Sequence, residues 1–546
     1  MASLDALGFI YLHCCVYRVP LIIDISDIGE KKSNPVTGRR KFHLIRGTIG
    51  SVAVKLLWSS GNDPFFMIKM KFHLMRDVLL RIPYRNLSNR LFFPRSLDNH
   101  YCNPFMTKLF FKHQYNEEDP LIRASSSSGN LVATTTVNHI VFAISASAKG
   151  WPNRGPYVDL WWRPNQTRGV VWLDKAPEYP WPSTSPPFRV SEDTSRFKEY
   201  DKHNNPSTIR AARMILETFK LGFEDVRWFV KADDDTLVII DNLVDVLAKY
   251  DHNRYYYIGG NSECVAQNDM HAFNMAFGGA GIAVSYPLAK ALAKNLDGCL
   301  KRYPFVYGED HVIQSCMTEL GVSVTKEPGF HQIDLHGDVS GFLSAHPQAP
   351  LVTLHHLDII DPIFPSMSRY EAVHNFMRAA MVESPRLLQQ IIGYDQQKRW
   401  SVSISWGYSV HIYEELHSPG YLQRPLQTFS AWNKRASPPF MFNVRPLSND
   451  SCSMPHVFYF ESVRAADLNQ TVTSYIRRTA WELSSCGNHS VKSISEVEVF
   501  TPAKRLQWGV ERRECCEIES VPRVNIIKIT VRACRENETL IWSHLS

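Results

Sequence analysis

The pattern of apolar and polar positions predicts alternating strands and helices between residues 137 and 360. Short apolar runs bounded by polar or turn residues are typical of buried strands. Between them, apolar residues recur every three or four positions, as in helices that pack one side against a sheet. The strand-like runs are HIVFAIS (139–145), GVVWL (169–173), VRWFVK (226–231) and YYYIGG (255–260). This alternation predicts an α/β domain with a largely parallel sheet.

Two of the predicted helices flank the region that carries most of the candidate chemistry. The first has apolar residues at helical spacing between positions 209 and 219. The second runs from Asp310 to Leu320 and is followed by Gly321, a residue suited to the left-handed conformation that ends many helices. Shorter helices are predicted around 243–247 and 288–296.

After Tyr370 the pattern predicts a region that is rich in strands. A helical stretch from Ala372 to Ile392 comes first. The strand-like pieces that follow are SVSISW (401–406), FMFNV (440–444), HVFYF (456–460) and NIIKITV (525–531). We therefore divide the chain into a poorly defined amino-terminal or stem region (1–130), an α/β domain (131–370) and a β-rich, Cys-containing domain (371–546).

The amino-terminal region has the weakest pattern. Its most apolar run, Leu7–Ile23, is 17 residues long and includes His13, Arg18 and Pro20, whereas a membrane-spanning helix needs about 20 predominantly apolar residues. One interpretation is a poor signal anchor. The other is a disordered stem or an incorrectly predicted amino terminus, with the low-complexity segment 125–130 as a linker to the α/β domain.

Composition excludes several classes of protein but names no activity. With 44% hydrophobic and 21% charged residues, the chain is neither wholly disordered, nor a coiled-coil rod, nor a polytopic membrane protein. The net charge of +6 is spread over 546 residues without a dense run of Lys and Arg. We therefore expect no nucleic-acid partner.

The cysteines and glycosylation sequons favour an oxidising, lumenal compartment. Eleven cysteines show no paired C-x-x-C spacing of a zinc site, and five of them lie after residue 448. Four of the six Asn-x-Ser/Thr sequons lie in the same tail. Cys299 and Cys316 can pair, as can cysteines of the tail, although the sequence does not fix the connectivity.

The most informative motif is Asp233-Asp234-Asp235, which directly follows an apolar strand. Three adjacent carboxylates repel one another, and leaving them unpaired in a partly buried turn is costly. A hard divalent cation such as Mg²⁺ or Mn²⁺ removes that cost through oxygen ligands. The alternative is an exposed acidic turn. Because open α/β sheets bind ligands at the carboxyl ends of their strands, the position favours a metal.

Three further motifs carry candidate chemistry. The glycine-rich loop 278–281 lets the backbone approach a ligand closely, or is an ordinary tight turn. The pair Glu309-Asp310 opens a helix, where a carboxylate can serve catalysis or cap the helix. In the pair His355-His356, a neutral imidazole could complete a metal shell. Because adjacent residues of a strand point to opposite faces, at most one of these histidines is expected to be a ligand.

Taken together, these motifs resemble those of the fringe-like β1,3-glycosyltransferases, a family that includes fringe and core 1 β1,3-galactosyltransferase. The stretches that carry the resemblance are WFVKADDDTLVIIDNL, FGGAGIAVS, YGEDH and VTLHHLD. It covers roughly residues 137–365 for the wider family. For the plant fringe-related proteins, to which the chain is most similar, it covers roughly 130–546 and includes PYVDLWWRPNQTRGVVWLD.

The resemblance implies a GT-A (Rossmann-like) fold, a nucleotide-sugar donor, dependence on Mn²⁺ and inversion at the anomeric carbon. Carried over motif by motif, it implies metal ligation by Asp235, Asp233 and His355, with His356 as the fallback. It gives Asp310 the role of catalytic base. The residues that it places at the substrates are Asp234, Gly278, Gly279, Ala280, Gly281 and Glu309.

We therefore expect a glycosyltransferase that uses Mn²⁺ or Mg²⁺ to move a sugar from a UDP-sugar to a glycan or glycoconjugate hydroxyl in a β1,3 linkage. By family analogy it would be a type II membrane glycoprotein of the Golgi with a lumenal catalytic domain. One alternative is a non-catalytic carbohydrate-binding or scaffolding protein that retains the fold. Another is a metal-dependent phosphotransferase or hydrolase, although the sequence has no GxxxxGK[ST] loop.

Overall fold

The structure of the protein is a computed structural model, which divides into two compact units, residues 1–126 and 127–546. It describes residues 10–14, 19–23, 42–49 and 52–59 of the first unit. In the second unit it describes residues 134–540 apart from 204–205, 347–348, 468–469, 479–489, 503–513 and 521–524. All four motifs of candidate chemistry lie in the second unit.

The described residues of the first unit form two pairs of antiparallel strands. β1 (Ile10–Cys14) pairs with β2 (Val19–Ile23), and β3 (Phe42–Ile49) pairs with β4 (Val52–Ser59). The apolar run 7–23 thus contains two strands, and a helical anchor there is not supported. Of the helices in the described parts of the chain, none is long and apolar enough to cross a membrane. The segment 125–130 lies outside the described residues.

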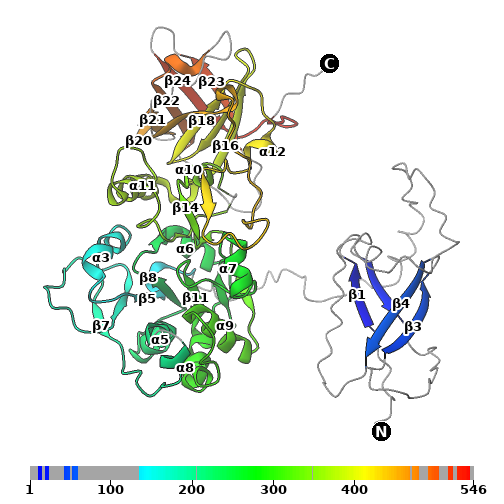
Figure 1. Ribbon diagram of the computed structural model, residues 1–546. Helices are drawn as coiled ribbons and strands as arrows, with labels where there is room; N and C mark the ends of the chain where they lie inside the picture. Colours follow the sequence, from blue (N-terminus) through cyan, green and yellow to red (C-terminus); the bar gives the residue numbers. More distant parts are fainter. Residues whose placement is uncertain are drawn as a thin grey trace, which may run out of the picture. The chain divides into compact units, whose positions relative to one another are not determined.

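The second unit is built around a sheet of seven described strands in the order β12-β10-β11-β8-β5-β6-β7 (Figure 1). Neighbouring strands are parallel, except that β11 is antiparallel to both β10 and β8. The predicted largely parallel sheet is therefore confirmed. The strands are β5 (Ile140–Ser145), β6 (Arg168–Leu173), β7 (Phe188–Val190), β8 (Trp228–Asp233), β10 (Tyr257–Gly259), β11 (Ile282–Ser285) and β12 (Val324–Lys326).

Three helices cover one face of this sheet: α5 (Pro206–Lys220), α8 (Tyr286–Leu300) and α9 (Glu309–Glu319) (Figure 1). Their apolar sides share a core with Val141 of β5 and Phe229 of β8. The periodicity that predicts α5 and α9 therefore reflects burial against the sheet.

The opposite face of the sheet packs against α3 (Trp151–Asp159) and α6 (Ile240–Leu247). Because side chains alternate along a strand, Ile140, Phe142 and Ile144 of β5 reach this second core while Val141 does not. A small sheet lies beside it, in the order β13 (Phe330–His331), β15 (Thr353–Leu354), β9 (Leu237–Val238). Further short elements are α4 (Tyr200–His203), α7 (Val265–Met270), β14 (Leu335–Gly337), α10 (Ser340–Leu343), α12 (Pro419–Leu422) and β19 (Phe429–Ala431).

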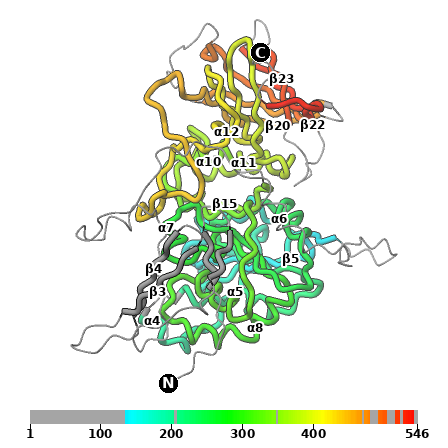
Figure 2. The backbone as a smooth tube through the Cα atoms, turned by 90° about the vertical axis from the view of Figure 1, so that its right-hand side faces the viewer, coloured from blue at the N-terminus to red at the C-terminus, as the bar shows by residue number. Residues whose placement is uncertain are grey.

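A second large sheet follows helix α11 (Arg369–Glu383) and has eight described strands in the order β16-β17-β18-β20-β21-β22-β24-β23. In Figure 2, β20, β22 and β23 of this sheet lie above α11. Neighbouring strands are antiparallel except β22 and β24. One apolar core contains residues of both large sheets, Phe142 and Val410 among them. The strands are β16 (Gln390–Asp395), β17 (Trp400–Ser405), β18 (Ser409–Tyr413), β20 (His456–Asp467), β21 (Gln470–Ile476), β22 (Glu496–Pro502), β23 (Cys515–Ser520) and β24 (Ile526–Arg532).

Two predicted elements of this region are wrong. Helix α11 ends at Glu383 rather than at residue 392, because residues 384–386 form a 3-10 turn that contains Pro385, and β16 begins at Gln390. The run FMFNV (440–444) is not a strand, and its Phe440 makes only an isolated bridge to Cys264. Prolines at 438, 439 and 446 flank this run, and proline supplies no backbone donor for a strand ladder.

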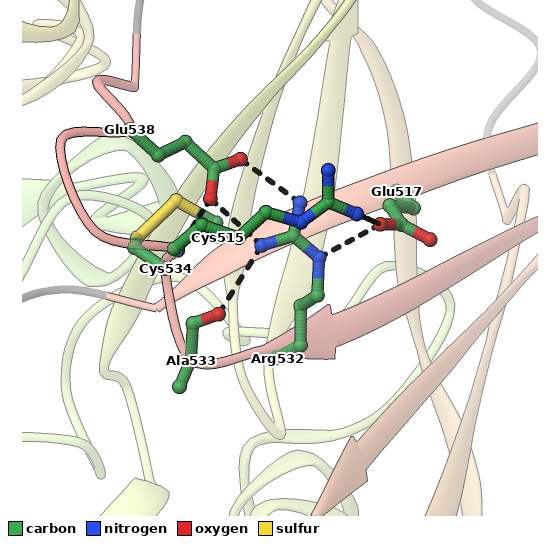
Figure 3. Close-up of a disulfide and its surroundings, with 7 residues drawn as sticks. Cys515, Glu517, Arg532, Ala533, Cys534 and Glu538 are labelled. Carbon is green, nitrogen blue, oxygen red and sulfur yellow. Dashed lines mark hydrogen bonds and ion pairs between the residues drawn. A yellow bond between two sulfur atoms is a disulfide. The ribbon is translucent and has the colours of Figure 1, made fainter.

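Two disulfides are described, Cys299–Cys316 and Cys515–Cys534. The first joins α8 to α9, so the expected pairing of these two cysteines is confirmed. The second joins the start of β23 to the residues after β24. Beside it, Arg532 donates hydrogen bonds to the carboxylates of Glu517 and Glu538 (Figure 3). The carboxyl-terminal strands are thus held by a covalent bond and by ion pairs.

Replacing both Cys299 and Cys316 by alanine should destabilise the protein. The bond closes a loop with a sequence separation of 17 residues. A crosslink over a loop of this size restricts the unfolded chain, so we expect the free energy of unfolding to fall by about 2–4 kcal/mol in urea denaturation. Adding a reductant should destabilise the double variant less than the wild type. Equal free energies for the two proteins under oxidising conditions would contradict the prediction.

Candidate active site

Strand β8 delivers the aspartates to the carboxyl edge of the parallel strands. Lys231, which has no exposed surface, lies two residues before Asp233 and therefore on the same face of the strand. Its Nζ is 2.9 Å from Asp233 Oδ1 and 3.4 Å from Glu309 Oε1. Burial lowers the pKa of Lys231, but the two carboxylates raise it by more, so the side chain stays protonated. One buried cation thus joins the DDD motif to the start of α9.

A second cation, Arg154 of α3, contacts the other two aspartates. Its Nη1 lies 3.1 Å from Asp234 Oδ1, and its Nη2 lies 3.1 Å from Asp235 Oδ2. Its Nε lies 3.0 Å from Asp358 Oδ2. Burial and the charge of Asp235 raise the pKa of Asp234 to about 7, although Arg154 opposes the shift. The guanidinium therefore ties α3 to the acidic turn and to the segment that follows β15.

Both histidines of the His355-His356 pair lie at this cluster. Strand β15 ends at Leu354 and His356 has a φ of 64°, so the two rings turn to the same side with centroids 3.7 Å apart. The prediction that they point to opposite faces is wrong, because it assumed that the strand continues. One ligand-type atom from each of Asp235, His355 and His356 lies within 4.8 Å of the others. These three residues could hold a metal ion together.

The electrostatics of the cluster suit a cation. Burial lowers the pKa of His355, but Asp235, whose Oδ1 lies 3.0 Å from His355 Nε2, raises it to about 9. Burial raises the pKa of Asp235, yet His355 and Arg154 together hold it well below its usual range. His355 Nδ1 is buried and has no hydrogen-bond partner among the residues that the structure describes. Since imidazole nitrogen suits transition metals and carboxylate oxygen suits Mn²⁺ or Mg²⁺, the donor set fits Mn²⁺.

The glycine loop 278–281 adopts its shape because side chains of the cluster approach it closely. A Cβ at Gly279 would overlap the imidazole of His355, and a Cβ at Gly278 would come within 2.8 Å of Glu309 Oε1. Gly281 has a φ of 92°, in the left-handed region that glycine adopts without strain. The loop therefore allows close approach, as expected, and the groups that approach it are His355 and Glu309.

Glu309 and Asp310 open α9 directly after Gly308, whose φ is 87°. Asp310 accepts hydrogen bonds from the backbone N–H of Gly278 (3.2 Å) and of His311 (2.8 Å). Burial raises the pKa of Asp310, and these hydrogen bonds only partly offset the shift. The pKa of Glu309 is likewise raised by burial, against the opposing charge of Lys231. An oriented carboxylate with a raised pKa is suited to accept a proton.

A cavity of about 350 Å³ opens at this edge of the sheet. Its lining residues are Ser145, Ala146, Ser147, Arg154, Ser207, Arg210, Ala211, Asp233, Asp234, Asp235, Glu309, His355 and His356. Asp310 and the loop 278–281 are not among these residues. Gly278 and Gly279 lie against Glu309 and His355 of the lining, and Asp310 accepts a hydrogen bond from Gly278. Three of the four predicted motifs thus line one cavity, and the fourth supports them.

Several residues of the site are missing from the sequence-based prediction. Lys231 had a usable signal, since it is a charged residue in an otherwise apolar strand that ends at the DDD motif. Asp358 stands in the same motif as the two histidines. Arg154 and Arg210 had no such signal in the sequence. Their helices precede the DDD motif, and only the fold brings these two side chains close to it.

Comparison with known proteins places the chain near β1,3-glycosyltransferases. The profile of a family described as "Protein of unknown function, DUF604" matches residues 267–516. The β-1,3-N-acetylglucosaminyltransferase lunatic fringe of Xenopus laevis is 34% identical over 89 residues, which are 14% of this chain and 24% of that protein. The β-1,3-glucosyltransferases of Homo sapiens and Mus musculus are each 30% identical over 119 residues, 22% of this chain and 23% of theirs.

The matched stretches are short. The chain spans about a quarter of the length of the curated relatives it matches. The family profile bridges the α/β part and the second large sheet, since it begins in α7 and ends in β23. The relatives are thus distant β1,3-glycosyltransferases, and the profile joins both large sheets of this chain.

Gly279→Ala should displace His355 and weaken the binding of Mn²⁺. The added methyl group overlaps the imidazole, which cannot then stay beside Asp235. Because His355 is a candidate metal ligand, its displacement should cost at least about 10-fold in Mn²⁺ affinity by isothermal titration calorimetry. Gly298→Ala is the matched control, because a Cβ there, in the last turn of α8, meets only Arg302 Nη1 at 3.6 Å. Equal Mn²⁺ affinity of Gly279→Ala and Gly298→Ala would show that His355 is not a ligand.

Proposed function

We propose that this protein is an inverting glycosyltransferase of GT-A type, which moves a sugar from a UDP-sugar to a glycan or glycoconjugate hydroxyl in a β1,3 linkage. The observation that carries the proposal is the convergence of the three aspartates, Glu309 and His355 on one cavity at the carboxyl edge of the sheet. The similarity to three β1,3-glycosyltransferases supports the same activity.

The donor diphosphate would lie in the cavity, where two arginines face it. Arg154 is engaged with carboxylates, whereas Arg210 donates to the Ala146 carbonyl (2.9 Å) and forms no ion pair with the described residues. Guanidinium groups bind phosphate oxygens strongly through paired N–H donors. Asp235, His355 and His356 would hold Mn²⁺ or Mg²⁺, which would supply positive charge to offset the charge on the departing diphosphate.

Asp310 would act as the general base. In one displacement with inversion, the acceptor oxygen forms its bond to the anomeric carbon while the sugar–phosphate bond breaks and its electron pair leaves with UDP. The proton of the acceptor hydroxyl passes to the Asp310 carboxylate. The hydrogen bonds from Gly278 and His311 hold this carboxylate in one orientation, and its raised pKa favours proton acceptance.

Aromatic side chains beside Asp310 suit an acceptor sugar. Tyr307 is 66% exposed and stacks on His271 with ring centroids 6.1 Å apart. His271 also contacts His311, the residue after the base, at 5.9 Å. Phe305, 69% exposed, belongs to the same loop, which the Cys299–Cys316 disulfide closes at its base. Exposed rings on a constrained loop offer flat apolar faces to the C–H groups of a pyranose.

The disulfides suit an enzyme of the secretory pathway. Structural disulfides persist in oxidising compartments and are rare in the cytosol. Cys299–Cys316 and Cys515–Cys534 are both inside folded parts of the second unit. We infer a lumenal, Golgi-type location for the catalytic part.

Asp310→Asn should abolish sugar transfer and leave Mn²⁺ and UDP binding intact, because amide and carboxylate have the same shape but only the carboxylate accepts the proton. The assay follows UDP release from UDP-galactose, UDP-glucose, UDP-N-acetylglucosamine and UDP-N-acetylgalactosamine, with and without a mixed acceptor library. We expect a rate loss on the order of 10²–10⁴-fold for one donor.

The control for this experiment is Glu319→Gln, at the far end of the same helix, which should keep wild-type turnover. Near wild-type turnover of Asp310→Asn would refute the assignment of the base. Acceptor-independent release by the wild type would identify a hydrolase instead. Binding of donor without any release would favour a non-catalytic sugar-binding protein.

Tyr307→Ala should raise the acceptor KM and leave the donor KM unchanged, because the ring lies outside the donor cavity. Loss of one stacking face should weaken acceptor binding by roughly 5-fold or more, and Tyr307→Phe should retain most of the affinity. Tyr255→Ala removes a ring that is 49% exposed at a different position of the chain and should change neither constant. A rise in the donor KM alone would contradict this placement of the acceptor.

A further inference from the structure

Trp432 comes from a segment outside the seven-stranded sheet, yet it reaches the candidate metal centre. It directly follows β19, which pairs antiparallel with β14 from Leu335↔Ala431 to Gly337↔Phe429. The Trp432 N–H extends this pairing by donating to the Asp334 carbonyl at 3.0 Å. The backbone of the tryptophan is therefore fixed before its side chain makes any contact.

The indole ring of Trp432 stacks on two imidazoles. It lies parallel to His356, with centroids 4.9 Å apart and an interplanar angle of 10°. It also lies parallel to His336, at 4.2 Å and 14°. His356 in turn contacts His355 at 3.7 Å. A continuous column of rings therefore runs from His336 to His355, which contacts Asp235.

The segment that carries Trp432 is anchored independently of this stack. Beyond the tryptophan, the Pro439 carbonyl accepts the N–H of Val265 (3.0 Å), and the Met441 N–H donates to the Glu263 carbonyl (2.9 Å). The Cys264 thiol lies 3.3 Å from the carbonyl oxygen of Asn433, the next residue. These contacts hold the segment of Trp432 in place without a contribution from the stack.

His356 needs such support. It lies after the end of β15 in a left-handed conformation that is rare for a residue other than glycine. Its ring makes a hydrogen bond with the backbone of Ile333, and its Nδ1 lies 3.6 Å from Asp334 Oδ1. Asp334 is itself held by the Ser262 hydroxyl at 2.5 Å. The flat face of Trp432 is a further contact that restricts rotation of the His356 ring.

We propose that Trp432 is a positioning residue, which fixes the imidazole of His356 and through it holds His355 against Asp235 in the geometry that binds the divalent cation. This inference rests on the proposed function, because it assumes that the cluster binds a metal. It assigns the region after residue 370 a direct part in the active site. The family profile that bridges both large sheets agrees with such a shared role.

The test compares Trp432→Ala and Trp432→Phe in the full chain, with Mn²⁺ as the probe. Loss of the ring should weaken Mn²⁺ binding about 10- to 100-fold in calorimetry, the usual cost of losing a group that orients a ligand. The phenylalanine variant should recover most of the affinity. Trp400→Ala removes another buried indole, packed under Lys398 in the second large sheet, and should leave the Mn²⁺ affinity unchanged. Circular dichroism confirms that each variant is folded.

A second readout needs no metal. In protein with ¹³C-labelled histidine, the ring protons of His356 should move downfield in Trp432→Ala, because the ring current of the indole is lost. His356→Gln assigns the signal. Unchanged histidine signals in folded Trp432→Ala, or unchanged Mn²⁺ affinity, would overturn the inference. A third outcome is that the wild type binds no Mn²⁺ although the histidine signals move in Trp432→Ala. That result would refute the proposed metal function and confirm the stacking contact.

Discussion

The repulsion among the adjacent carboxylates at the end of β8 is the constraint on which the rest of the site depends. Two like charges 4 Å apart repel by about 4 kcal/mol at an effective dielectric constant of 20. Asp234 and Asp235 are buried, so water screens little of that repulsion. Three groups from different elements offset this repulsion by pairing with the carboxylates: Lys231 of β8, Arg154 of α3 and the imidazole of His355 after β15.

The ion pairs of these cations bring together residues that are far apart in the sequence. Arg154 and Asp358 are 204 positions apart and meet at 3.0 Å. Trp432 lies further along the chain, and its stack reaches the same histidines. Each ion pair neutralises a charge that the other ion pairs do not neutralise. Removing one partner therefore leaves a buried charge unpaired. The segment that carries Trp432 therefore contributes to the same site as the α/β part.

The sequence predicted those site residues that stand together in short motifs. It did not predict the residues that reach the site only through the fold. Some candidate residues stand in short motifs whose residue types indicate charge and metal chemistry. They are the three aspartates of the DDD motif, Glu309, Asp310 and His355. Arg154 has no such signature, because an arginine in a helix is usually on the surface. The opposite-face argument for His355 and His356 failed because one residue with positive φ replaces the strand geometry.

The fold was predictable to a similar extent and for similar reasons. Strands β5 and β8 are long enough and apolar enough for periodicity to identify them. Helix α11 was extended too far because its apolar positions run on into β16, and only Pro385 marks the break. The antiparallel course of β11 depends on tertiary pairing with β8 and β10, which no local pattern encodes.

The most direct test of the central claim is anomalous diffraction from crystals of the protein grown with Mn²⁺ and UDP. The account predicts one strong manganese peak between the Asp235 carboxylate and the His355 imidazole, with the diphosphate beside it in the cavity of about 350 Å³. A manganese peak away from these side chains, or UDP bound there with Arg154 and His355 still closed on Asp235 and no metal, would contradict it.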